Sequence, residues 1–274
     1  MGTAGMTGAV GVTAGGPLVV CTDAARTYGT GTGAVVAVHG ASCTVAAGAG
    51  IAVVGPSGSG KSTLLHLMAG LDRPTAGEIT HPGLPEGPLA RHIGFVFQGP
   101  SLLPPLTAAE NVALPLRIDG VGETEAGERA LAALESLGLA ALAAKLPDEL
   151  SAGQAQRVAV ARVLARRPRL ILADEPTGQL DRGSAEQVMA VLLGAAERLG
   201  AAVVVTTHDT RVADALPTRW HMTDGRLVLP DGTDRELQDR ELQDSGPQAP
   251  REPQVPQESQ ASRRHRGRQE REAR

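Results

Sequence analysis

Aromatic side chains are scarce in this chain of 274 residues, which contains one Trp, one Tyr and two Phe. Ala, Val, Leu and Gly must therefore fill the core, and a nucleic-acid surface made of stacked aromatic rings is excluded. The net charge is −4, from 26 basic and 30 acidic residues, so no overall positive field attracts a polyanion. We therefore expect no nucleic acid among the partners of this protein.

Cysteine and long apolar runs are also scarce. Cys21 and Cys43 have neither the paired spacing of a zinc site nor the number that a disulfide scaffold needs, which favours a reduced, cytoplasmic setting. The uncharged stretches near the N-terminus are interrupted every few residues by Gly, Thr or Ser, so we expect no membrane span. Lysine occurs only at positions 61 and 145, which suggests that a primary amine is needed there.

Composition divides the chain into three parts. Residues 1–16 are mostly Gly, Ala and Thr and are predicted to be a flexible leader. Residues 231–274 are rich in Pro, Gln, Arg and acidic side chains, and a five-residue repeat starts at Asp234 and again at Asp239, which predicts a disordered tail. A solvated tail is favoured over weak contact of its arginine-rich end with anionic lipid. Residues 17–230 are predicted to form the globular domain.

Short apolar runs in that domain predict an α/β fold with a mainly parallel sheet. Runs of this kind, without polar alternation, suit strands that are buried on both faces, and several precede helical patterns. They span residues 18–21, 51–54, 93–97, 170–173 and 202–205. Between the third and fourth runs the periodicity is only helical, and Thr107 with Glu110 forms a predicted capping box. We therefore expect a helical insertion at about residues 99–167.

A glycine-rich loop follows the run at residues 51–54 and precedes a helical pattern. Its glycines let consecutive backbone N–H groups converge on phosphate oxygens, and the helix N-terminus adds partial positive charge. The lysine can reach the β- and γ-phosphates, and the serine after it can ligate Mg²⁺. A chance match in a glycine-rich turn is the alternative, which the strand before the loop makes unattractive. The predicted P-loop and the next residue are Gly55, Pro56, Ser57, Gly58, Ser59, Gly60, Lys61, Ser62 and Thr63.

Two adjacent carboxylates end the run at residues 170–173. Asp174 is placed to hold a magnesium ion, and Glu175 would then lie beside the γ-phosphate, where it can polarise an attacking water. A strand that ends in an ordinary polar turn is the alternative. The P-loop elsewhere in the chain favours the magnesium site, because two buried carboxylates are costly without a cation.

A third segment, Leu150 to Gln154, precedes a helical pattern. Ser151 suits a helix N-cap, and the small residues after it leave backbone N–H groups open to an anion. By itself the segment predicts only a capped helix.

These three segments, in this order, resemble the ATP-binding subunits of ABC transporters. Ser151 lies 23 residues before Asp174, and the resemblance covers residues 17 to about 229. It implies a P-loop NTPase core, a small antiparallel β subdomain and a helical insertion. It also implies that two ATP molecules are sandwiched in a head-to-tail dimer, in which the signature segment of one subunit, Ser151, Ala152, Gly153 and Gln154, completes the ATP site of the other.

The resemblance implies roles for four more residues, each of which could instead be structural. Tyr28 matches the aromatic residue that stacks on adenine, and Gln98 the glutamine that touches magnesium and water. Asp181 matches the loop that couples the two sites, and His208 the histidine that holds the γ-phosphate. The implied catalytic residues are therefore Glu175, His208 and Gln98, the metal ligands are Ser62, Gln98 and Asp174, and the cofactors are ATP and Mg²⁺.

Further segments, including residues 71–78 and 102–116, resemble the lipoprotein-release and macrolide-export branch of this family. The resemblance implies ATP hydrolysis that powers a separate transmembrane permease at the inner face of the cell membrane. An ATPase that regulates a cell-envelope complex without moving a solute is the alternative. The sequence departs from the family at Ala152, where glycine is usual. Because alanine adds a methyl group and disfavours positive φ, we expect a site that closes less readily.

Overall fold

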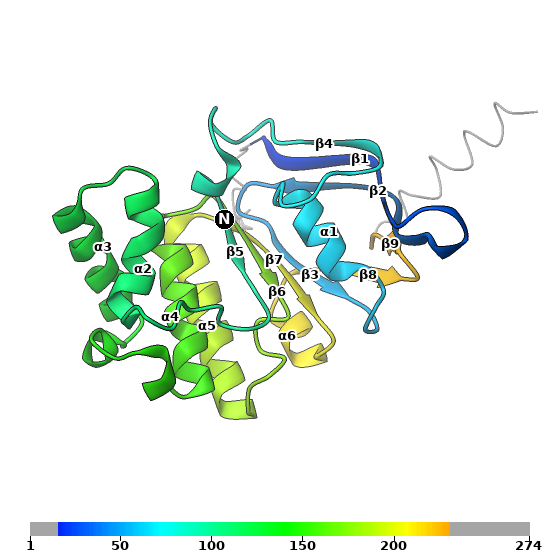
Figure 1. Ribbon diagram of the computed structural model, residues 1–274. Helices are drawn as coiled ribbons and strands as arrows, with labels where there is room; N and C mark the ends of the chain where they lie inside the picture. The colour runs from blue at the N-terminus through cyan, green and yellow to red at the C-terminus, as the bar shows by residue number, and fades with distance from the viewer. Residues whose placement is uncertain (1–15, 231–274) are drawn as a thin grey trace, which may run out of the picture. The chain divides into compact units, whose positions relative to one another are not determined.

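The computed structural model describes residues 16–230, so the predicted tail and all but the last residue of the predicted leader lie outside the described residues. The described chain forms two sheets and six α-helices (Figure 1). The strands are β1 (Pro17–Tyr28), β2 (Val35–Ala46), β3 (Gly50–Val54), β4 (Ala76–Thr80), β5 (Ile93–Val96), β6 (Leu170–Asp174), β7 (Ala202–Thr207), β8 (Thr218–Thr223) and β9 (Arg226–Val228). The helices are α1 (Lys61–Met68), α2 (Ala108–Ile118), α3 (Glu123–Ser136), α4 (Ala152–Leu164), α5 (Arg182–Leu199) and α6 (Thr210–Asp214).

The larger sheet has the order β5-β6-β7-β3-β8-β9 and is parallel except for β9. The prediction of a mainly parallel sheet is confirmed, and four of the five apolar runs lie in it. Successive residues of β6 explain the continuous apolar run, because Leu170 and Leu172 pack into one core while Ile171 and Ala173 pack into the other. A strand covered on both faces has no position for a polar side chain until its end.

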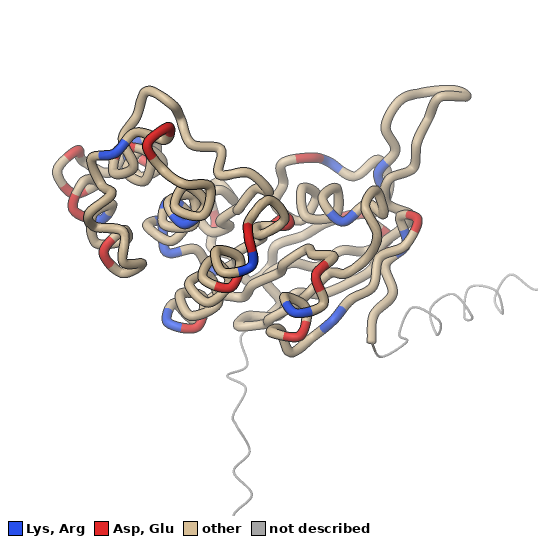
Figure 2. Tube along the Cα trace, turned by 90° about the horizontal axis from the view of Figure 1, so that it is seen from below, with Lys and Arg blue, Asp and Glu red and all other residues tan. Residues whose placement is uncertain are grey.

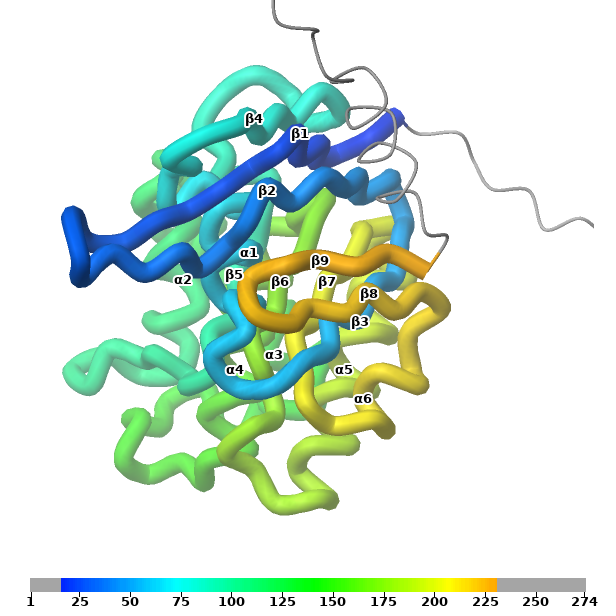
Figure 3. Tube along the Cα trace, turned by 90° about the vertical axis from the view of Figure 1, so that its right-hand side faces the viewer, coloured from blue at the N-terminus to red at the C-terminus, as the bar shows by residue number. Residues whose placement is uncertain are grey.

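The remaining run, residues 18–21, was predicted to lie in the parallel sheet, and this prediction is wrong. It lies in β1, the central strand of a separate antiparallel sheet with the order β2-β1-β4. Leu18, Val19 and Cys21 of this run are buried because they share a core with α1 and the near face of β3. Burial therefore makes the run apolar, but burial does not reveal which strand it pairs with. Figure 3 shows β9 beside β2, where His39 N–H donates to the carbonyl of Gly225 over 2.8 Å and joins the two sheets.

Three helices, α2, α3 and α4, separate β5 from β6 and form a layer with α5 (Figure 1). The predicted capping box of α2 is confirmed: Thr107 Oγ1 accepts from Glu110 N–H, and the Glu110 carboxylate accepts from Thr107 N–H. None of the helices in residues 16–230 is both long and apolar enough to cross a bilayer. Acidic and basic residues are scattered over the described trace in the view of Figure 2, with no stripe of one sign.

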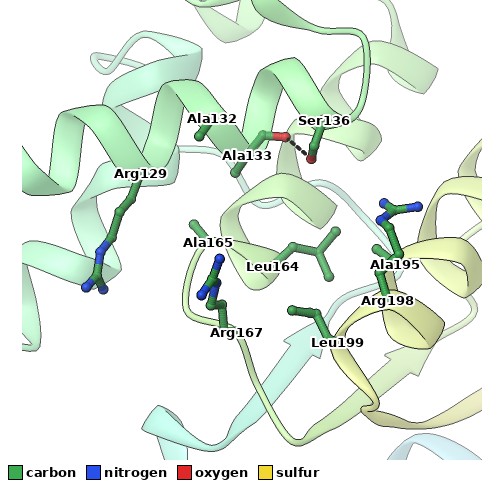
Figure 4. Close-up of a pocket in the computed structure, with 10 residues that line it drawn as sticks. All are labelled: Arg129, Ala132, Ala133, Ser136, Leu164, Ala165, Arg167, Ala195, Arg198 and Leu199. Carbon is green, nitrogen blue, oxygen red and sulfur yellow. Dashed lines mark hydrogen bonds between the residues drawn. The ribbon is translucent and has the colours of Figure 1, made fainter.

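A groove of about 510 Å³ lies where α3, the end of α4 and the end of α5 meet (Figure 4). Three arginines line it, Arg129, Arg167 and Arg198, and Arg129 is already paired with Glu125. Arg167 precedes β6, and Arg198 precedes β7. The groove therefore lies at the amino edge of the parallel sheet, whereas the predicted P-loop follows the carboxyl end of β3.

Candidate nucleotide site

The glycine-rich loop connects β3 to α1 at the carboxyl edge of the parallel sheet. Gly58 and Gly60 have φ of +78° and +97°, values that L side chains rarely adopt. A Cβ atom on Gly60 would also collide with the carbonyl oxygen of Ala37, whereas one on Gly58 would meet nothing within 4 Å. The loop therefore packs against β2 on one side and is open at Gly58 on the other, as a phosphate cradle requires.

Lys61 is the first residue of α1, and its side chain is buried, with 4% exposed. Its Nζ atom donates to the carbonyl oxygens of Gly55 at 3.0 Å and Pro56 at 2.9 Å, so the amine lies across the mouth of the loop. The same Nζ lies 3.5 Å from Glu175 Oε1. A single cation is therefore held between the loop and the carboxylate that follows β6.

Asp174 ends β6 and is also buried, with 8% exposed. Its Oδ1 atom accepts hydrogen bonds from Ser62 Oγ at 3.0 Å and from Thr206 Oγ1 at 2.6 Å. In residues 16–230, no three His, Cys, Asp or Glu side chains are grouped closely enough to hold a metal on their own. One hydroxyl and one carboxylate suit Mg²⁺, which takes most of its remaining ligands from phosphates and water. The Ser62 and Asp174 side chains therefore fit the predicted magnesium site.

Glu175 has a strained backbone, with φ of +43°, which few non-glycine residues adopt. Its N–H is held by Thr206, donating to Oγ1 at 2.9 Å and to the carbonyl oxygen at 3.1 Å. Its Oε2 atom lies 3.1 Å from His208 Nδ1. The Gln98 side chain lies near the Glu175 carboxylate, because both approach Gly178. A Cβ atom built on Gly178 would lie 3.3 Å from Glu175 Oε2 and 3.6 Å from Gln98 Nε2.

The signature segment forms the first turn of α4. Ser151 Oγ accepts from Gln154 N–H, and Gln154 Oε1 accepts from Ser151 N–H, so the predicted N-cap is present as a full capping box. Neither Ala152 nor Gly153 has positive φ, because both are helical residues. The expectation that Ala152 opposes a required left-handed conformation is therefore wrong.

Gly153 is constrained by packing instead. A Cβ built on Gly153 would lie 2.8 Å from Ser184 Oγ and 2.9 Å from Ser184 Cβ, closer than atoms pack. Ser184 belongs to the first turn of α5, which Asp181 caps: the Asp181 carboxylate accepts from Ser184 N–H at 3.0 Å and from Ser184 Oγ at 2.7 Å. These bonds hold the pKa of the Asp181 carboxyl below its usual value. The signature segment is therefore packed against the Asp181 loop.

Tyr28 ends β1 and is 41% exposed. Its hydroxyl donates to Asp72 Oδ2 at 2.9 Å, and the Arg26 guanidinium carbon lies 4.7 Å from the centre of its ring. The ring therefore has a cation on one face and a fixed hydroxyl.

The structure thus groups the predicted residues into three clusters. One contains Lys61, Ser62, Asp174 and Glu175 with His208 and Gln98; the second contains the signature segment and Asp181; the third contains Tyr28. The contacts of Ser151 and Gly153 stay within α4 and lead to α5, not to the P-loop. This separation is what a signature segment needs if it serves the site of another subunit.

Sequence reasoning missed three residues around these clusters. Thr206 bonds both Asp174 and the Glu175 backbone, and its only signal was its place at the end of a strand. Gln156 and Arg162 of α4 donate to the carbonyl oxygens of Phe97, Pro100 and Ser101, on either side of Gln98. Burial lowers the pKa of the Arg162 guanidinium. No local pattern marks such long-range contacts.

Comparisons with known proteins agree with this geometry. Residues 38–178 match the ABC transporter family model. The chain is 44% identical over 192 residues to the lipoprotein-releasing system ATP-binding protein LolD of Hydrogenovibrio crunogenus, which covers 67% of this chain and 84% of that protein.

Two solved structures have the same fold. A dimeric structure of the ATP-binding cassette MJ0796, in a post-hydrolysis state with ADP and Pi, is 38% identical, with a TM-score of 0.68 and coverage of 76% of this chain and 96% of that one. The cbiO1 protein of Clostridium perfringens, part of the ABC transporter complex cbiONQ, is 28% identical, with a TM-score of 0.69 and coverage of 82% and 92%. With the site geometry and the matched family model, these similarities show that the chain belongs to the ABC transporter family as an ATP-binding cassette.

Proposed function

We propose that this protein hydrolyses ATP to ADP and phosphate, using the cluster at the carboxyl edge of β3, β6 and β7. The observation that carries the proposal is the position of Glu175, with Oε1 3.5 Å from Lys61 Nζ and Oε2 3.1 Å from His208 Nδ1. The strained carboxylate is held between a lysine at the predicted phosphate cradle and a histidine. It is well placed to act on a water that attacks the γ-phosphate.

In this proposal the P-loop N–H groups and the Lys61 amine bind the phosphates, and Lys61 exchanges the carbonyl oxygens of Gly55 and Pro56 for phosphate oxygens. Glu175 accepts a proton from water as the water oxygen bonds to the γ-phosphorus and the bond to the β-phosphate oxygen breaks. His208 holds Glu175 Oε2 and lies where it can contact the γ-phosphate. Mg²⁺, held by Ser62, Asp174 and Gln98, would neutralise charge that develops on the phosphate oxygens.

We further propose that two copies of the chain bind ATP between them. The support is that the signature segment Ser151–Gln154 is packed away from the P-loop of its own chain, and that the similar MJ0796 cassette is dimeric. The domain of residues 17–230, with its helical insertion at about residues 99–167, would be the unit that pairs. Asp181, bonded to Ser184 beside Gly153, would link the two sites.

The similarity to LolD supports a separate transmembrane permease as the partner and a role of the lipoprotein-release or export type, with the protein at the inner face of the membrane. The alternative is a cassette that regulates an envelope complex without moving a solute. Identification of the membrane protein that copurifies with this chain separates the two functions.

Glu175→Gln tests the catalytic proposal directly. The amide keeps the size of the side chain but cannot accept the proton of water, so we expect turnover to fall at least about 100-fold, in line with general-base catalysis. ATP affinity should stay within about twofold, because Lys61 and the P-loop remain. Phosphate release and ATP titration measure the two quantities. Wild-type turnover would remove Glu175 from this role.

Lys61→Ala tests the binding part, and Lys145→Ala, which changes the only other lysine, is the matched control. Loss of a hydrogen bond to a charged group costs about 1.5–3 kcal/mol, so we expect ATP affinity to fall about 10- to 150-fold in Lys61→Ala. The control should bind ATP as the wild type does. Equal ATP affinity in the two variants would contradict the P-loop assignment.

A further inference from the structure

Tyr28 is tied to the helix that carries the P-loop lysine. Asp72, which accepts a hydrogen bond from the Tyr28 hydroxyl, lies four residues after the end of α1. The backbone N–H groups of Asp72 and Leu71 both donate to the carbonyl oxygen of His66 in α1. The loop from α1 to β4 is fixed to β1 a second time. Thr75 N–H donates to the carbonyl of Ala25 at 2.7 Å, and its Oγ1 accepts from Thr27 N–H at 3.2 Å.

Arg26 holds the same ring from the side. Residues 26 and 28 of β1 share a face of the strand, which brings the guanidinium to 4.7 Å from the ring centre. Arg26 Nη2 also lies 2.9 Å from Asp72 Oδ1, so Asp72 bonds the hydroxyl with one oxygen and the guanidinium with the other. The buried Arg26 Nε has no hydrogen-bond partner, as expected of a guanidinium that lies over a ring.

This arrangement leaves one ring face for a ligand. Arg26 covers the other face, while the Tyr28 residue as a whole is 41% exposed. A planar group that stacks on the ring is thus confined to a single side. Because the Tyr28 hydroxyl is bonded to the loop that follows α1, hydrogen bonds and α1 itself connect the ring to the P-loop lysine, Lys61.

We propose that Asp72 and Arg26 are positioning residues that set the Tyr28 ring at the height and angle where the base of a nucleoside triphosphate can stack while its phosphates occupy the P-loop. This inference rests on the proposed function. Neither residue touches the nucleotide; both act through the ring. The consequence is specific: loss of either contact weakens the binding of ligands that carry a base and leaves the binding of a bare triphosphate unchanged.

Titration of the full chain with ATP and with inorganic tripolyphosphate tests the proposal. Asp72 acts through the ring, so the stacking of one base on one aromatic ring sets the expected effect: Asp72→Ala should weaken ATP binding about 5- to 150-fold, with tripolyphosphate affinity unchanged within about twofold. Asp72→Asn keeps an acceptor for the hydroxyl and should restore much of the ATP affinity. Glu78→Ala, which removes an exposed carboxylate from β4, is the matched control and should change neither affinity.

Tyr28→Phe gives a second route, since it keeps the ring but removes the tethered hydroxyl. We expect a weakening of ATP binding no larger than in Asp72→Ala, which also removes the ion pair with Arg26, and no further loss when the two changes are combined, because the contact between the hydroxyl and the carboxylate is already absent in Asp72→Ala. Unchanged ATP affinity in Asp72→Ala, or equal losses for ATP and tripolyphosphate, would overturn the positioning role. A wild-type chain that binds neither ligand would instead overturn the proposed function.

Discussion

Gly153→Ala places one methyl group in the tightest packing of the signature segment. The new Cβ would lie 2.8 Å from Ser184 Oγ and 2.9 Å from Ser184 Cβ, so the first turns of α4 and α5 must move apart by about half an ångström. Rotation of the Ser184 side chain does not relieve the contact, because Ser184 Cβ itself is too close. The Asp181 carboxylate also holds the N–H and Oγ of Ser184.

The sign of the change in the free energy of unfolding shows whether packing or helix propensity dominates in Gly153→Ala. Alanine in place of glycine within a helix stabilises by about 0.5–1 kcal/mol. Overpacking costs about 1–3 kcal/mol, so we expect a net loss of about 1 kcal/mol in the free energy of unfolding. Gly127→Ala in α3 is the matched control, because a Cβ there meets nothing within 4 Å, and it should stabilise the protein.

Urea unfolding of the full chain measures both variants. Thermal unfolding is a second measurement: in a domain of this size, a change of about 1 kcal/mol in the free energy of unfolding shifts Tm by about 2–4 °C. Ser184→Gly removes both clashing atoms, so the cost of Gly153→Ala should be about 1–3 kcal/mol smaller in that background. If Gly153→Ala stabilises the protein as much as Gly127→Ala does, the packing argument is refuted.

Two further changes test the helical layer and the signature segment. Asp119→Ala removes the half-buried carboxylate that accepts two hydrogen bonds from Arg166, at 2.8 and 2.6 Å, so we expect a loss of about 1.5–3 kcal/mol in urea unfolding. Glu123→Ala, which breaks an exposed ion pair, should cost less than about 1 kcal/mol, and equal losses would contradict this assignment. Ser151→Arg should abolish ATP hydrolysis but leave ATP binding to one chain intact; normal turnover would exclude a site shared between subunits.

Local chemistry explains why several features could be predicted from the sequence. The Thr107–Glu110 and Ser151–Gln154 capping boxes close within three residues, so the residues that make them are visible side by side in the chain. The same holds for the glycine-rich loop, where a strand, a turn and a helix follow one another. Burial of both sheet faces also leaves a local trace, since it makes a whole strand apolar.

Contacts between distant residues were decided by the tertiary structure. Thr206 meets Asp174 because β6 and β7 pair in the register Asp174↔Thr206, and a shift of one residue would turn the hydroxyl to the other face. The sheet to which β1 belongs depends on its pairing partners, which apolarity does not encode. Gly153 is constrained by Ser184 and not by its own φ, so its role depends on how α4 and α5 pack. The sequence determined which side chains are candidates for the chemistry. Strand register and helix packing decided which of them meet, because those contacts join parts of the chain that local patterns treat separately.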